Sequence, residues 1–119
     1  MKIFFDGGCR PNPGRIELAV VARGVAYVDR DAGHGSSHDA EWLALLRAVA
    51  QVRALGVRDA VLLGDSAAIV TQANAALAGR AAPGHASDFA AAVAGLRLRV
   101  RHIKRTQNLA GIALARLHR

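Results

Sequence analysis

The sequence predicts an α/β protein with a five-stranded mixed sheet, three antiparallel strands followed by two parallel ones, flanked by helices. Short apolar runs separated by Gly and Pro fill the first 28 residues, which is typical of a strand meander. After them, segments with apolar residues at helical spacing alternate with further apolar runs. The 119 residues are 52% hydrophobic, enough for one buried core and too few for two. We therefore expect residues 1–119 to form a single domain.

Three strands are expected first. The run 3–5 is apolar and ends at Asp6, and the Gly and Pro residues crowded between positions 7 and 14 predict a loop. Residues 16–21 and 24–28 are the next two strands, joined by a tight turn. The three segments together indicate an antiparallel meander.

A long helix should follow the loop at residues 33–37. Ser36 with Asp39 three positions later suits a helix start, and Gly56 suits a helix end near Leu55. Apolar residues at helical spacing form its expected buried stripe: Trp42, Leu45, Leu46, Val49 and Val52.

Strands and helices alternate in the second half of the chain. The expected elements are a strand at 60–63 ending at Gly64 and Asp65, a helix capped by Ser66 and running to about Leu77, a loop at 79–85, a short helix at 87–94, a strand at 96–103 and a final helix opened by Asn108. Alternation of this kind adds parallel strands to the meander.

The net charge of +7 is concentrated at one end of the chain. Residues 1–96 carry nine basic and nine acidic side chains, whereas residues 97–119 carry seven basic ones and no acidic one. In the strand at 96–103, arginines alternate with Leu98 and Val100, which predicts one cationic and one apolar face. Such a field attracts polyanions, although a solvated basic surface explains the charge alone equally well.

Several classes of protein are disfavoured. With Cys9 as the single cysteine, neither an intrachain disulfide nor a multi-cysteine zinc site can form. No apolar run is long enough to span a membrane, and the N-terminus lacks the pattern of a signal peptide. We expect a cytoplasmic protein with no membrane association, and nothing in the sequence indicates an obligate protein partner.

Three acidic residues are candidate metal ligands. Asp6 and Asp65 both follow apolar strands, and ligands bind outside such strand ends in α/β sheets. Glu41 shares a helix face with Leu45 and should point toward the sheet. Three convergent carboxylates suit Mg²⁺ or Mn²⁺ and two-metal phosphodiester hydrolysis. Each acid alone would more commonly be a turn or cap residue; their joint placement favours the metal site.

Four motifs, in order along the chain, carry a family resemblance. The segment DGGCRPNPG from Asp6 to Gly14 resembles the opening metal-binding loop of ribonuclease H type 1, and SSHDAEWLAL from Ser36 to Leu45 resembles that family's glutamate helix. LGDS from Leu63 to Ser66 is similar to its second aspartate strand, and HIKRTQN from His102 to Asn108 to its closing strand–helix junction. The short length resembles the compact bacterial members.

The resemblance implies a metal-dependent endonuclease that cuts the RNA strand of RNA–DNA hybrids. Asp6, Glu41 and Asp65 would be both the catalytic residues and the Mg²⁺ or Mn²⁺ ligands. The expected substrate-binding residues, which would contact the RNA and its 2′-hydroxyls or the phosphates, are Gly7, Gly8, Cys9, Asn12, Ser36, Ser37, His38, Lys104 and Arg105. For Asn12 a plain turn, for His38 an exposed loop position and for the two cations a solvated surface remain alternatives.

One position departs from the family pattern. The family carries a fourth carboxylate on the last helix, where this chain has Ile112, and no acid follows Asp88. Isoleucine cannot bind a metal, so three outcomes are open: a slow or Mn²⁺-preferring nuclease, a site assisted by His102, or a ribonuclease H-like domain that binds hybrid or double-stranded RNA without cutting. Resolvases and exonucleases of the same fold rank behind these, because the opening Asn-Pro-Gly motif argues against them.

Overall fold

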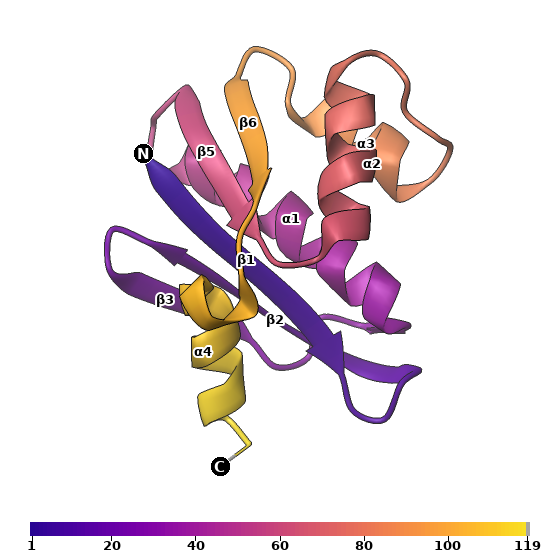
Figure 1. Cartoon of the computed structure of the whole chain (residues 1–119), viewed down its shortest axis with the longest axis vertical. Coiled ribbons are helices and arrows are strands. Elements are labelled where there is room, and N and C mark those ends of the chain that lie inside the picture. The colour runs from indigo at the N-terminus through magenta and orange to yellow at the C-terminus, as the bar shows by residue number, and fades with distance from the viewer. Residues whose placement is uncertain (119) are drawn as a thin grey trace.

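The computed structural model describes residues 1–118, which form one mixed sheet with helices on both faces (Figure 1). The strands are β1 (Lys2–Cys9), β2 (Gly14–Ala22), β3 (Val25–Asp29), β4 (His34–Gly35), β5 (Asp59–Gly64) and β6 (Arg97–His102). The helices are α1 (Ser37–Ala54), α2 (Ala67–Leu77), α3 (His85–Ala92) and α4 (Leu109–Arg116), and a 3₁₀ turn, η1 (Arg105–Gln107), precedes α4.

The strand order β3-β2-β1-β5-β6 confirms the predicted mixed sheet. β1, β2 and β3 pair antiparallel, whereas β5 joins β1, and β6 joins β5, in parallel. The predicted count of five strands is one too low, because the two-residue β4 pairs with the start of β2. The chain before β4 is held there by Ile16, whose N–H donates to the Gly33 carbonyl and whose carbonyl accepts from Ala32.

β1 is longer than predicted. The expected strand ended at Asp6 and left positions 7–9 in a loop, but β1 continues to Cys9. β2 pairs with it residue by residue, from Ile3 opposite Ala22 to Cys9 opposite Ile16. This pairing satisfies the hydrogen-bonding groups of the Gly7 and Gly8 backbone, although the glycines by themselves predict a turn. Asp6 therefore lies within a strand rather than at its end.

Helices cover the two faces of the sheet unequally. α1, α2 and α3 lie on one face and enclose the main core, while α4 packs on the other face against β1, β2 and β3 (Figure 1). The main core contains the largest buried side chains from both layers, including Trp42, Phe5, Phe89, Ile3 and Leu62. Beneath α4, a smaller cluster joins Ala19 and Val21 of β2 to Ala110 and Leu114.

The predicted helix starts are confirmed at three of four positions. Ser36 caps α1 in a reciprocal capping box with Asp39, Ser66 caps α2, and Asn108 caps α4. α3 instead begins at His85, two residues before the predicted start. Of the residues predicted to form the buried stripe of α1, Leu46 is only half-buried.

Among residues 1–118, no helix has both the length and the apolar character needed to cross a membrane.

Candidate metal centre

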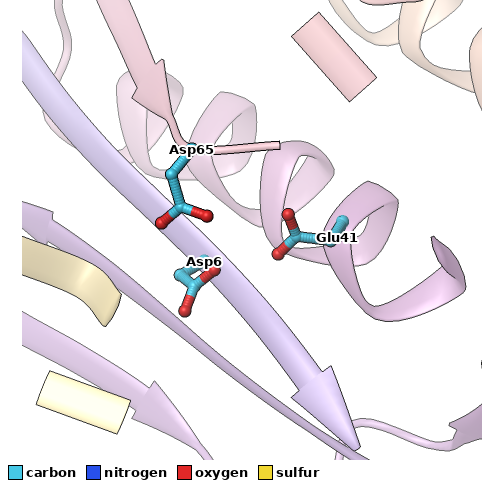
Figure 2. Close-up of side chains that lie close together, drawn as sticks. All are labelled: Asp6, Glu41 and Asp65. Atoms are coloured by element: carbon cyan, nitrogen blue, oxygen red, sulfur yellow. The ribbon is translucent and has the colours of Figure 1, made fainter. Parts of the chain in front are cut away.

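Three carboxylates converge beside the central strand β1, between α1 and α4. Asp6 comes from β1, Glu41 from the second turn of α1 and Asp65 from the residue after β5. One oxygen of each lies within 4.8 Å of the others, and Figure 2 shows the three side chains directed toward a common space. The convergence predicted from the three separate motifs is present in the fold.

Gly7 allows Glu41 to reach this space. The Gly7 N–H donates a hydrogen bond of 2.9 Å to Glu41 Oε1. A Cβ atom at position 7 would overlap the backbone carbonyl of Ala40, the residue before Glu41. The missing side chain therefore lets α1 approach β1 closely enough to place its glutamate beside Asp6.

Asp65 is held in place by Asn108, which is fully buried. The Asn108 Nδ2 donates to Asp65 Oδ2 at 2.9 Å and to the Phe5 carbonyl at 3.0 Å, while its Oδ1 accepts from the Ala110 N–H at 3.1 Å. One side chain thus caps α4 and fixes the orientation of a candidate ligand. The cap is predictable from the sequence, whereas the contact with Asp65 is not.

Burial and mutual repulsion disfavour ionisation of two of the three acids. Burial, with the Asp65 charge adding to it, raises the pKa of Asp6 to about 6, against the opposing effects of its hydrogen bonds and of Arg105. Burial, with the Asp6 charge next, raises the pKa of Glu41 well above its usual range. Close carboxylates need a proton or a cation between them.

The donor set fits a small divalent cation. Mg²⁺ binds oxygen at 2.0–2.1 Å, so two oxygens on opposite sides of one ion stand about 4.2 Å apart. The carboxylate oxygens already lie within 4.8 Å of one another. Small side-chain rotations would bring them into contact with one ion, and hard carboxylate oxygens suit Mg²⁺ or Mn²⁺.

A cavity of about 660 Å³ opens over the carboxylates. Its walls include five of the expected substrate-binding residues: Gly7, Gly8, Cys9, Ser37 and Arg105. The other four lie outside its lining: Asn12, Ser36, His38 and Lys104.

Comparison with known protein families places this fold and cavity in context. Residues 5–118 match the family model described as "Reverse transcriptase-like". The chain belongs to the reverse transcriptase-like family. No curated protein matches the sequence.

The fold of this reverse transcriptase-like protein is that of ribonuclease H type 1. The ribonuclease H1 of Halobacterium salinarum NRC-1 is similar at 22% identity and a TM-score of 0.71, over 95% of this chain and 92% of that one. The N-terminal ribonuclease H domain of a Mycobacterium tuberculosis protein, solved as a fusion with maltose-binding protein, is similar at 22% identity and a TM-score of 0.73, over 99% and 97%. A ribonuclease H1 isolated from compost by metagenomics is similar at 22% identity and 0.72, over the same shares.

Of the four expected binding residues outside the cavity of this reverse transcriptase-like protein, two are engaged in structural contacts and two are exposed. Asn12 Oδ1 accepts from the Ser37 N–H at 3.1 Å and so ties the β1–β2 loop to the start of α1. The Ser36 hydroxyl is engaged in capping α1. His38 and Lys104 are exposed. His102 Nε2 forms a hydrogen bond of 3.2 Å with the backbone carbonyl of Asp65. His102 is not part of the group of three carboxylates that could hold a metal ion.

Ile112, where the family pattern has its fourth acid, lines the cavity. Beside it, a Cβ atom at Gly111 would lie 3.3 Å from Asp6 Oδ2 and 3.7 Å from Asp65 Oδ2. This turn of α4 therefore faces the carboxylates directly. The isoleucine, at the position where the resemblance predicts a fourth acid, is therefore part of the cavity wall.

Two further residues line the cavity and were not singled out from the sequence. Glu17 of β2 is buried, and its carboxylate pairs with His118, just after α4, and with Arg30 at 3.3 Å. Glu17 and His118 both face the cavity. One feature of the sequence could have indicated Glu17, because it is the single acid within the apolar run of β2. The strand pairing places its side chain on the same face of the sheet as that of Asp6.

Proposed function

We propose that this protein is a metal-dependent endonuclease that hydrolyses the RNA strand of RNA–DNA hybrids. The convergence of Asp6, Glu41 and Asp65 in one cavity carries the proposal. The names of the three similar structures described above, which are ribonuclease H1 proteins or a ribonuclease H domain, support the choice of substrate. We take residues 1–119 as one catalytic domain.

Each part of the cavity has a proposed role. Asp6, Glu41 and Asp65 hold Mg²⁺ or Mn²⁺, and a bound ion supplies activation of water and stabilisation of the leaving oxygen. Gly7 and Asn108 keep Glu41 and Asp65 in position through their hydrogen bonds. Of the remaining cavity residues, Gly8, Cys9, Ser37 and Arg105 contact substrate.

Substrate contacts divide by chemistry. The RNA strand approaches the backbone of Gly8 and the neighbouring Cys9, because a Cβ at Gly8 would meet no atom within 4 Å and the space over this glycine is open. Asn12, Ser36, Ser37 and His38 form the polar rim that reads the 2′-hydroxyl face. Lys104 and Arg105 contact phosphates, and Arg105 does so from within the cavity.

A cleavage assay tests the proposal. Purified protein is incubated with an end-labelled RNA–DNA hybrid and Mn²⁺, next to an Asp6→Asn variant whose fold is checked by circular dichroism. We expect cleavage of the RNA strand by the wild type alone. Equal rates for the two proteins would show that the three acids are not a catalytic centre.

Ile112 favours a second candidate function. With the family's fourth anion replaced by an apolar residue at the cavity wall, the domain binds hybrid or double-stranded RNA without turnover. In that case the wild type binds nucleic acid with strong salt dependence and cuts none. Absence of binding at low salt would exclude this alternative.

The variant Ile112→Asp tests whether the residue at position 112 limits metal binding and cleavage. A unit charge about 4 Å from a cation contributes about 1 kcal/mol in water and about 4 kcal/mol near a protein surface. We expect at least a tenfold gain in Mn²⁺ affinity or cleavage rate. Leu109→Asp is the control, because position 109 is exposed and outside the cavity lining. A folded Ile112→Asp variant that gains no more than this control contradicts the role given to position 112.

A further inference from the structure

We propose that the uncovered face of β5 and β6, with the start of β1, is a second nucleic-acid contact surface, which binds the phosphate backbone of the substrate duplex outside the cleavage site. We call this surface the arginine face and define it by Lys2, Arg97, Arg99 and Arg101. The inference rests on the proposed function, because it takes the hybrid as the ligand.

Strand alternation places the arginine face on the same side of the sheet as α4. Leu98 and Val100 of β6 are buried in the main core, so Arg97, Arg99 and Arg101 project from the opposite face. α4 packs on that face against β1, β2 and β3, at the other end of the strand order from β6 (Figure 1). The three arginines are consequently exposed.

The arginine face is continuous with the metal centre. Pairing runs from Phe4 to Leu63 and from Leu63 to Arg101, so these three residues form one row across β1, β5 and β6. Asp6 lies two residues after Phe4, and Asp65 lies two residues after Leu63. Arg101 is therefore about 7 Å along the strands and about 5 Å across them from Asp65. Arg105, which follows β6 in the chain, adds another cation in the cavity wall.

The arginine face carries more positive charge than the protein neutralises. Within β5 and β6, the one acid on this side is Asp59, whose Oδ1 pairs with Arg99 at 2.9 Å. Within the described residues 1–118, Lys2, Arg97 and Arg101 form no ion pair. Unpaired exposed cations are available to phosphates and release counterions from nucleic acid on binding.

The spacing of the arginines favours a backbone ligand. Residues two apart on a strand are about 7 Å apart, so Arg97 and Arg101 place guanidinium groups along about 13 Å of one straight edge. The aromatic residue in this region, Phe4, is half-buried under α4, so no stacking platform for bases accompanies the cations. Contacts here would be independent of sequence and would lengthen the binding site in one direction from the metal centre.

Substrates extended on one side or the other test this direction. Each contains a hybrid core of about six base pairs, about 20 Å long, and a DNA duplex extension of about ten base pairs either 5′ or 3′ of the RNA. Binding is measured by fluorescence anisotropy without divalent ions, so it does not depend on cleavage. The variant Arg97→Gln/Arg101→Gln removes the two unpaired arginines.

We expect the variant to bind one extended substrate more weakly and to leave the other, and the bare core, unchanged. For the affected substrate, the slope of log K against log salt should fall by about 1.8, because each phosphate contact contributes about 0.9. Arg97→Lys/Arg101→Lys should retain the wild-type slope. Arg23→Asn/Arg80→Gln removes the same charge from two exposed positions elsewhere, and Asn is tolerated at the positive φ of position 23.

Other results would overturn the inference. The variant could lose the same affinity for both extended substrates, or show the same salt slope as the Arg23/Arg80 control. Either result would show that the arginines act only through the overall charge of the protein. Failure of the proposed function looks different, because wild-type protein then leaves the hybrid core uncut in Mn²⁺ whatever the extension. Thermal unfolding of each variant checks that the fold is intact.

Discussion

At the scale of single residues, the candidate centre depends on groups that are not themselves ligands. Asn108 is the clearest case, since one buried amide bonds the Asp65 carboxylate, the Phe5 carbonyl and the first turn of α4. Buried polar groups that lose a partner cost about 1–3 kcal/mol. A change at this position should therefore affect both stability and metal binding.

Asn108→Ala is expected to lower the free energy of unfolding by about 3 kcal/mol, from the lost cap and the unpaired Phe5 carbonyl. It should also weaken Mn²⁺ binding, because Asp65 is no longer oriented. Asn74→Ala is the matched control, since Asn74 donates one bond of 3.1 Å to the Val100 carbonyl away from the cavity. Urea unfolding and Mn²⁺ titration of both variants measure the two effects. Equal Mn²⁺ affinities would show that Asn108 is only structural.

At the scale of elements, the position of α1 against β1 sets the geometry of the site. Glu41 lies in the second turn of a helix whose start is fixed by Ser36 and Asp39, and Gly7 permits the close contact with Ala40. Helix and strand thus meet at one glycine next to the carboxylates. The contact is tight enough for a single methyl group to disturb it.

Gly7→Ala should therefore destabilise the fold by about 1–3 kcal/mol, as overpacking does, and should reduce hybrid cleavage by displacing Glu41. Gly8→Ala is the control, because its Cβ would meet no atom within 4 Å. We expect Gly8→Ala to stay within about 0.5 kcal/mol of the wild type. Similar melting temperatures for the two variants would contradict the account of the α1–β1 contact.

The end of α4 is tied to β2 and β3 through Glu17. Burial alone would raise the pKa of Glu17, but its hydrogen bonds from His118 and Arg30 outweigh this and hold the pKa below the usual 4.5. A carboxyl with a lowered pKa stabilises the folded state above its unfolded pKa. That contribution is lost as the pH falls through the lower folded value.

Glu17→Gln should accordingly lower the free energy of unfolding by about 2 kcal/mol at pH 7, since Arg30 is half-exposed and the pair is only partly buried. The difference from the wild type should shrink as the pH falls below 4.5 and through the lowered folded pKa of Glu17, where the wild-type carboxylate becomes protonated. Unfolding curves between pH 3 and pH 7 measure it, with the exposed Asp31→Asn as control. A difference that does not change with pH would rule out the charge as its origin.

At the scale of the whole molecule, the site is assembled from parts of the chain that meet only in the folded state. β1, α1 and the end of β5 each contribute one carboxylate, and α4, which packs on the same face of the sheet as Asp6, forms one wall of the cavity. An ion that binds all three acids binds the native state and not the unfolded chain. Metal binding and folding are therefore coupled.

Mn²⁺ at about 100 times its dissociation constant should stabilise the protein by about 2.7 kcal/mol and raise Tm by about 5–15 °C at pH 8. Excess EDTA should reverse the shift. Asp6→Asn should melt higher than the metal-free wild type, because one of the repelling carboxylates is gone, and should gain little from Mn²⁺. An equal Mn²⁺ shift in both proteins would place the bound ion elsewhere.

The sequence by itself determined the mixed sheet, most helix starts and the three carboxylates, because apolar periodicity, capping residues and motif order are local properties of the chain. Only the tertiary structure decided the rest. The pairing with β2 draws Gly7 to Cys9 into a strand, and the packing of α4 brings Asn108 to Asp65 and His118 to Glu17. These contacts join residues distant in sequence, so no local pattern encodes them. Ile112 shows both sides: the sequence revealed the missing acid, and the fold placed that position in the cavity wall.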